Sequence, residues 1–262
     1  MTTEGGRAMA PATQQLTNSW EVALSKLHEW DPAWAEQCEK MLTDSWTKGI
    51  LPIKFIELLC VGLSSAHANI DPEETRRHIQ AALKAGASRQ EILFVLKCAA
   101  VLSIRSFSFN APGLLQEASV GSLEDFGTAR KKRLQKLGEE TPAVQKIKAL
   151  GHWNEDWDSL LFLDPVWMEE YMAMLAALYE KSEFSPKELE LLIIALEAAY
   201  GNMYGLGTRH HIKSAFRAGA TIDEVMEVLK LSVVQGVRAR NLAVPILSEE
   251  LDRHAASQNA KP

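Results

Sequence analysis

The chain repeats itself at an offset of 133 residues. Residues 31–34 (Asp-Pro-Ala-Trp) align with residues 164–167 (Asp-Pro-Val-Trp), and His78 aligns with His211. Between positions 31 and 117 about a third of the residues match their partners without a gap, which chance does not produce over such a length. One structural unit is therefore written twice, and both halves are expected to fold in the same way.

Both units contain sequence signals for the starts and ends of helices. An aspartate stands before a proline at Asp31 and at Asp164, where the acid caps a helix whose first turn tolerates proline. Ser88 and Thr221 each open a capping box that follows a helix-ending glycine. No segment alternates with period two beside a tight turn, so strands are not expected. The sequence predicts an all-α fold of two tandem repeats.

Each unit is expected to hold four helices followed by a proline-marked tail. Some of these helices are apolar around most of their circumference, so we expect them to be buried between the units. We place the first repeat at residues 13–117, a connector at 118–140 and the second repeat at 141–253, and we expect a helix to open at Thr141-Pro142. The expected helices are about 33–47, 53–67, 72–85 and 89–103, then 166–180, 187–200, 206–218 and 222–237.

Composition excludes several classes of partner. A net charge of −6 argues against nucleic acid, which needs an electropositive face. No stretch approaches the roughly 18 apolar residues of a membrane span and none resembles a signal peptide, so we expect no membrane partner and a cytoplasmic location. Cys60 and Cys98 fall in apolar helices, where we expect inert thiols, while Cys38 is the one expected to reach solvent.

The segment from Glu57 through His78 to Ile92 resembles the carboxymuconolactone decarboxylase family. That superfamily also contains the alkylhydroperoxidase D-like proteins, and residues 211–221 resemble the same block. The resemblance implies an all-helical bundle. Short members of the family assemble as rings, which implies a homo-oligomer here: a trimer of two-unit chains is favoured, and a dimer also covers the apolar helices.

The redox branch of the superfamily carries a Cys-x-x-Cys pair whose second cysteine lies four residues before the histidine. Here those positions hold Asp71 and Glu74 in the first repeat, and Tyr204 and Gly207 in the second. A disulfide relay is therefore absent, and we expect neither thiol peroxidase nor disulfide reductase activity.

The decarboxylase branch matches the first repeat more closely, through Pro-Glu-Glu-x-x-x-His at residues 72–78. Glu74 and His78 are four residues apart and share a helix face, so they can present an acid and a base together. We therefore expect Glu74 and His78 to be catalytic. Decarboxylation also needs a cation to orient the carboxylate that remains, which Arg76, Arg77 or Arg105 could supply. Because consecutive residues point apart, only one of Arg76 and Arg77 is expected to face the pocket. No cofactor is expected.

The same residue types also have structural interpretations. Glu74 can instead complete a capping box, and His78 and His211 can be core histidines that donate to a carbonyl. Glu57 and Glu190 interrupt apolar helices near their starts. There they either stabilise the helix dipole or act as the proton-relay acid that the redox branch places on this helix.

The second repeat offers His211, His210, Tyr204 and Arg238 as further site candidates, with no acid at Gly207. Adjacent histidines on a helix point about 100° apart. No third ligand has a suitable spacing beside them, so no metal is expected.

These observations favour a cofactor-free enzyme of the carboxymuconolactone decarboxylase type. Its expected substrate is a small anionic lactone or keto acid, of the kind met in aromatic degradation. Two alternatives stay open: an alkylhydroperoxidase D-like antioxidant protein without its cysteine relay, and a non-catalytic small-molecule binding protein.

Overall fold

The structure is a computed structural model that describes residues 19–67, 70–118, 132–133, 135–137, 139–199 and 205–259. Helices fill nearly all of these ranges and no strand occurs within them, which confirms the predicted all-α class. Within the same ranges, no helix combines the length and the hydrophobicity that a membrane span requires.

The two units have the same order of helices. The first contains α2 (Ser19–Trp30), α3 (Pro32–Lys48), α4 (Ile53–Ser65), α5 (Pro72–Lys84), α6 (Arg89–Val101), η2 (Leu102–Ile104) and α7 (Arg105–Ala118). After α9 (Pro142–Ala149) and η3 (Glu155–Trp157), the second contains α10 (Asp158–Leu163), α11 (Pro165–Glu180), α12 (Pro186–Ala198), α13 (Gly205–Arg217), α14 (Ile222–Val234), η4 (Gln235–Val237) and α15 (Arg238–Asn259).

The helix starts follow the signals in the sequence. Asp31 and Asp164 each accept a hydrogen bond from the third residue after them, and each precedes a proline in the first turn. The capping boxes at Ser88 and Thr221 have both of their hydrogen bonds. These local devices set where each helix begins, so the expected boundaries lie within three residues of those observed.

The turn after α5 and the turn after α13 share one backbone conformation. Gly86 has φ 90° and Gly219 has φ 89°, in the left-handed region that residues with a Cβ rarely adopt. These glycines end their helices at equivalent places and return the chain toward the next capping box. The two units therefore turn in the same way as well as sharing a helix order.

The core lies where α4 of the first unit meets α12 of the second. Ten consecutive residues of α4, 55–64, are buried, as are nine of α12, 189–197. A Cβ at Gly62 would lie 3.0 Å from Val95 and 3.2 Å from Leu196, so the absence of a side chain lets the helices approach closely. The prediction that the apolar helices are buried between the units is confirmed.

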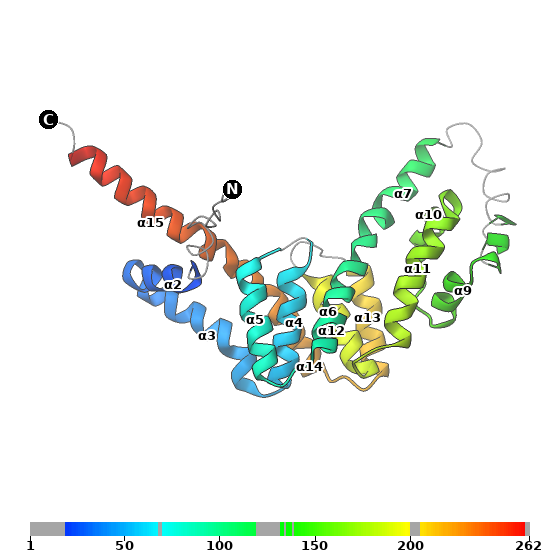
Figure 1. Cartoon of the computed structure of the whole chain (residues 1–262), viewed down its shortest axis with the longest axis horizontal. Coiled ribbons are helices and arrows are strands. Elements are labelled where there is room, and N and C mark those ends of the chain that lie inside the picture. Colours follow the sequence, from blue (N-terminus) through cyan, green and yellow to red (C-terminus); the bar gives the residue numbers. More distant parts are fainter. Residues whose placement is uncertain are drawn as a thin grey trace, which may run out of the picture.

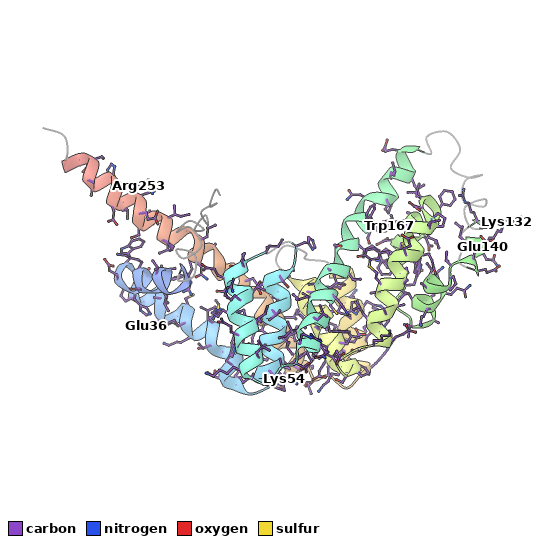
Figure 2. The ribbon with its side chains drawn as sticks, viewed as in Figure 1. Glu36, Lys54, Lys132, Glu140, Trp167 and Arg253 are labelled. Atoms are coloured by element: carbon purple, nitrogen blue, oxygen red, sulfur yellow. The ribbon has the colours of Figure 1, made fainter. Side chains whose placement is uncertain are left out.

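The units also exchange their outer helices. In Figure 1 the central helices form a block from which two arms rise, one made of α2, α3 and α15, the other of α7 and α9–α11. Each arm mixes both units: α15 of the second packs on α2 of the first, and α7 of the first packs on α10 and η3 of the second. Phe107 of α7 contacts Trp167 of α11, which Figure 2 labels in this second arm.

The proline-marked tails are helices. Pro112 lies inside α7 and Pro245 inside α15, although proline removes one backbone hydrogen bond from a helix interior. Packing of each helix on the other unit offsets that loss. These contacts are between the two units, so the sequence pattern within one unit does not indicate them. For this reason the two helices were not predicted.

Candidate functional site

Two cavities of similar construction lie between the units. The first-unit cavity, of about 280 Å³, is lined by α3, α4 and α5 together with α14, η4 and α15 of the second unit. The second-unit cavity, of about 360 Å³, is lined by α11, α12, α13 and residues 152–157, together with α6, η2 and α7 of the first unit. Each cavity is therefore closed by the last helices of the other unit.

His78 lines the first-unit cavity and is paired with the buried Glu57. His78 Nδ1 lies 2.7 Å from Glu57 Oε2, and both side chains are more than nine-tenths buried. The other oxygen of Glu57 accepts a hydrogen bond of 2.6 Å from the indole Nε1 of Trp46. Both oxygens of Glu57 are thus engaged, and its carboxylate fixes the orientation of the imidazole. His78 is therefore buried, and its Nδ1 contacts a carboxylate and not the carbonyl that the core-histidine alternative supposed.

The other side of His78 faces Glu74 and Arg77. Glu74 Oε2 lies 3.2 Å from His78 Nε2 and accepts a hydrogen bond of 2.5 Å from the guanidinium of Arg77. Asn241 of α15 reaches the other oxygen of Glu74 at 3.4 Å. Asp71 caps α5 without a reciprocal bond from Glu74, so the capping-box alternative for Glu74 is wrong.

These contacts determine the ionisation of both glutamates. Burial raises the pKa of Glu74, but hydrogen bonds from His78 and Arg77 outweigh it and hold the pKa at about 2. Burial likewise raises the pKa of Glu57, and the hydrogen bonds from His78 and Trp46 bring it below its ordinary value. Both are carboxylates at neutral pH. Glu74 therefore fits the role of a charged partner better than that of a proton donor.

The candidate arginines are separated by the fold. Both arginines are exposed, but Arg77 lines the first-unit cavity and Arg76 does not. This agrees with the expectation that only one of the two faces the pocket. Arg105 and Arg238 are the first residues of α7 and α15, and their side chains lie outside the part of the chain that the structure describes.

The second unit reproduces the histidine–glutamate pair. His211 Nδ1 lies 2.7 Å from Glu190 Oε2, with the same 21-residue separation along the chain as in the first unit. The Lys187–Glu224 ion pair at 2.7 Å likewise reproduces Lys54–Glu91 at 2.8 Å. His211 likewise contacts a carboxylate and not a carbonyl. The repeated helices therefore position the same pair of side chains twice.

The surroundings of the second pair differ. Glu197 of α12 lies 3.7 Å from His211 Nε2, although the sequence offered no acid at Gly207. Glu197 aligns with Ser64, so this carboxylate reaches the histidine from another helix than Glu74 does. At three further positions around the pair, the second unit has Tyr179, His210 and Gly207 where the first has Trp46, Arg77 and Glu74.

A third histidine, His152, joins the second-unit site from the segment between α9 and η3. Its Nε2 lies 3.8 Å from Glu190 Oε1, and its ring stacks on those of Tyr179 and His211. Burial lowers its pKa to about 4, which leaves a neutral imidazole at neutral pH. His152 precedes the aligned stretch of the second repeat, which begins at residue 164, so the alignment of the two halves gave no signal for it.

His152, Glu190 and His211 each offer a possible metal-ligand atom, and these atoms lie within 4.8 Å of one another. The spacing argument against a metal was therefore incomplete, because the fold supplies a third residue that the sequence places far from the other two. His210 also lines this cavity, with its ring 5.1 Å from that of His211. Tyr204 lies outside the described residues.

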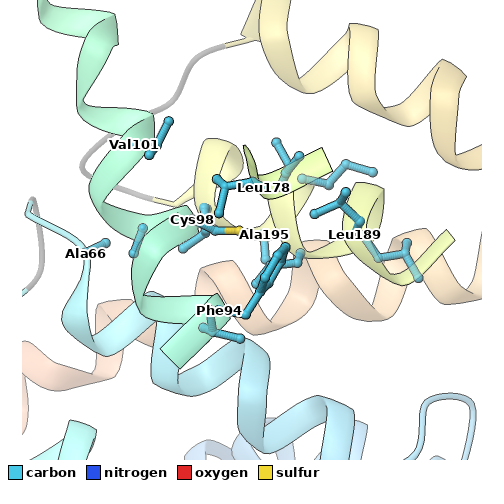
Figure 3. Packing of buried hydrophobic residues seen from close by; sticks show 14 of the residues in the cluster. Ala66, Phe94, Cys98, Val101, Leu178, Leu189 and Ala195 are labelled. Atoms are coloured by element: carbon cyan, nitrogen blue, oxygen red, sulfur yellow. The ribbon is translucent and has the colours of Figure 1, made fainter. Parts of the chain in front are cut away.

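The cysteines are placed for packing. Cys98 lies against Leu178 and Ala195 in the core at the edge of the second-unit cavity, and burial raises the pKa of its thiol to about 12 (Figure 3). Cys60 is buried, as expected. The expectation for Cys38 is wrong: it is also buried, because α15 covers it and the guanidinium of Arg240 contacts its sulfur at 3.4 Å.

Comparison with known proteins agrees with this arrangement. A solved structure of a proposed gamma-carboxymuconolactone decarboxylase subunit from Burkholderia xenovorans LB400 is similar to the chain, with 25% sequence identity and a TM-score of 0.73. The match covers 92% of this chain and 98% of that one. A search of curated proteins gave no match. The model of the carboxymuconolactone decarboxylase family matches residues 32–103 and again 165–248, more than half of the chain. The chain therefore belongs to the carboxymuconolactone decarboxylase family, whose unit it contains twice.

Proposed function

We propose that the chain is a cofactor-free acid–base enzyme that decarboxylates a small anionic lactone or keto acid in the first-unit cavity. The observation that carries the proposal is His78, a buried imidazole fixed by Glu57 on the wall of a cavity that also holds the guanidinium of Arg77. This places a proton-transfer group beside a half-exposed cation at one cavity. Membership of the decarboxylase family supports the same class of reaction.

Each residue has a separate role in this proposal. His78 transfers the proton, while Glu57 orients its ring and stabilises the imidazolium form. Arg77 binds the carboxylate that the substrate retains, in competition with Glu74, with which it is paired in the free site. Glu74 is a positioning residue, since its low pKa keeps it ionised.

The reaction follows from these roles. The bond from the ring to the departing carboxylate breaks, carbon dioxide leaves, and the electron pair passes into an enolate conjugated with the lactone or keto group. The imidazolium of His78 then donates its proton to the α-carbon. Apolar residues such as Leu63 and Leu231 line the same cavity and exclude water, which favours loss of the charged carboxylate.

The two alternatives differ in what the structure offers them. An alkylhydroperoxidase-type reaction needs a low-pKa thiolate, and all three cysteines are buried, with the pKa of Cys98 at about 12. A non-catalytic binding protein would use the same cavity and the same arginine. Turnover, and not binding, separates it from the enzyme.

The test compares His78→Ala with His211→Ala, because the two histidines occupy equivalent positions. Carbon dioxide release from carboxylated lactones and keto acids is measured for both variants and for the parent chain. We expect His78→Ala to lose about 10²–10⁴ in rate. We expect His211→Ala to retain most of the activity, and circular dichroism to report an intact helical fold for both.

Two results would contradict the proposal. If His211→Ala is the inactive variant, the reaction belongs to the second unit. If the parent chain binds these acids without releasing carbon dioxide, the binding-protein alternative holds.

The proposal includes association of several chains. Large apolar side chains remain exposed on α14 and α15, among them Ile222 (72%), Val233 (68%) and Leu242 (70%). Exposed apolar surface of this kind favours contact with another copy of the chain. Light scattering at micromolar concentration should report a trimer, with a dimer as the other closed assembly, and a mass equal to that of one chain would exclude both.

A further inference from the structure

We propose that the second unit binds one divalent first-row transition-metal ion through His152, Glu190 and His211. Among the described residues of the first unit, where the proposed reaction takes place, no such group of ligands occurs. The inference therefore stands independently of the proposed function.

The donor set suits this class of metal. Two imidazoles and one carboxylate are the protein ligands of many zinc and non-haem iron centres, which leave further positions open to water or substrate. Hard ions such as Mg²⁺ and Ca²⁺ prefer oxygen ligands alone. The side chains of all three residues are close to nine-tenths buried, so a bound ion would be shielded from bulk solvent on the protein side.

The geometry needs only a small adjustment. Ligands that bind one zinc ion at about 2.0–2.1 Å can lie no more than about 4.2 Å apart. The three donor atoms already lie within 4.8 Å of one another, and His211 Nδ1 is 2.7 Å from Glu190 Oε2. His152 belongs to a segment between two helices and not to a helix, so a side-chain rotation can close the remaining distance.

His152 has an unsatisfied atom in the free site. Its Nδ1 is buried without a hydrogen-bond partner. Its Nε2 lies 3.8 Å from Glu190 Oε1, which is too far for a hydrogen bond. A buried imidazole that makes no hydrogen bond at either nitrogen loses its hydration without compensation. Coordination of a metal ion would satisfy one of these nitrogens.

The charge of the second-unit cavity favours a cation. Its described lining includes Glu155, Asp156 and Glu197, three acidic side chains, and neither lysine nor arginine. In the first-unit cavity Arg77 already supplies positive charge beside the carboxylates, and its position is held by His210 in the second unit. The same fold thus carries a fixed guanidinium in one cavity and an electronegative, imidazole-rich pocket in the other.

Metal binding is tested on the full chain without a histidine tag, so that the only imidazoles are its own. Calorimetric titration with Zn²⁺, and absorption spectra with Co²⁺ as a spectroscopic probe, should report one ion per chain. His152→Ala, Glu190→Gln and His211→Ala should each weaken binding by about 10- to 100-fold or more. His78→Ala and Glu57→Gln, the matched changes in the first unit, should leave it unchanged.

A second measurement does not depend on how the variants fold. In the unchanged protein, diamagnetic Zn²⁺ should shift the imidazole NMR signals of His152 and His211 and leave those of His78 in place. The inference is overturned if the chain takes up no ion at a stoichiometry near one. It is equally overturned if binding survives His152→Ala with the fold intact, or falls as far with His78→Ala as with His211→Ala.

Discussion

The Glu57–His78 pair of the first unit and the Glu190–His211 pair of the second have the same sequence separation and the same 2.7 Å contact. Their neighbours are different. The first histidine lies between two carboxylates with the guanidinium of Arg77 beside them. The second lies among two further imidazoles and a tyrosine, with a carboxylate that comes from a different helix.

This difference shows that the shared helices determine where the histidine and glutamate lie, whereas single substitutions determine the charge around them. The glutamate is fixed by α4 or α12 and the histidine by α5 or α13, and these helices are the same in both units. The electrostatics of each cavity depend instead on a few substitutions. Chief among them are Arg77 against His210 and Glu74 against Gly207. The two units thus share a histidine–glutamate pair and differ in the charge of the side chains around it.

The largest expected difference concerns the orienting acid. Glu57→Gln keeps the shape of the side chain but removes the charge that stabilises the imidazolium of His78, so we expect decarboxylation to slow by about 10- to 100-fold. Glu190→Gln, the matched change, should leave the rate nearly unaltered. Steady-state measurement of carbon dioxide release checks both variants. Equal decreases in rate would contradict the proposal that the reaction takes place in the first unit alone.

Arg77→Met tests the electrostatics of the first unit. The pKa of Glu74 in the folded chain, about 2, lies below its ordinary value of 4.5, so Glu74 contributes stability above pH 4.5 that is lost as pH falls through 2. Without Arg77 this pKa should rise and the contribution shrink, by about 1–2 kcal/mol at pH 7 for a half-exposed arginine.

Urea unfolding at several pH values measures this effect. The gap between Arg77→Met and the parent chain should be widest near pH 7 and close toward pH 2. Arg76→Met, an exposed change on the same helix, serves as the control and should show no such pH dependence. A gap that stays constant with pH would assign the effect to packing and not to the carboxylate.

The smallest expected effect tests what the units share. Lys54 pairs with Glu91, and Lys187 with Glu224, each across 37 residues and each with a partly exposed lysine; Figure 2 labels Lys54 on the central block. Lys54→Met and Lys187→Met should each lower the free energy of unfolding by about 1 kcal/mol or less. Denaturant unfolding should give the same decrease for both variants. Unequal decreases would mean that the two ion pairs contribute differently to stability although their distances are similar.

Much of the fold was predictable because its signals are local. Capping residues, first-turn prolines and the glycines after α5 and α13 act within a few residues of the boundaries they set. The helices α7 and α15 were not predicted, since their stability depends on contacts with the other unit that no local pattern records.

The candidate site was predictable in part for the same reason. Glu74, His78 and Arg77 share one helix, and helical spacing brings them together. Asn241 and His152 reach the sites from helices or segments more than fifty residues away from the histidines they serve. Trp46 could have been found, because it aligns with Tyr179 and both are aromatic.

The exchange of closing helices has a consequence for how the chain can be divided. A fragment that ends before α14 would keep Glu57, His78 and Arg77, yet the wall formed by Leu231, Val234 and Asn241 would be missing. Its imidazole would then face open water, where a cation attracts a carboxylate only weakly. Neither half of the chain would form a complete cavity alone, because each half supplies the helices that close the other half's cavity.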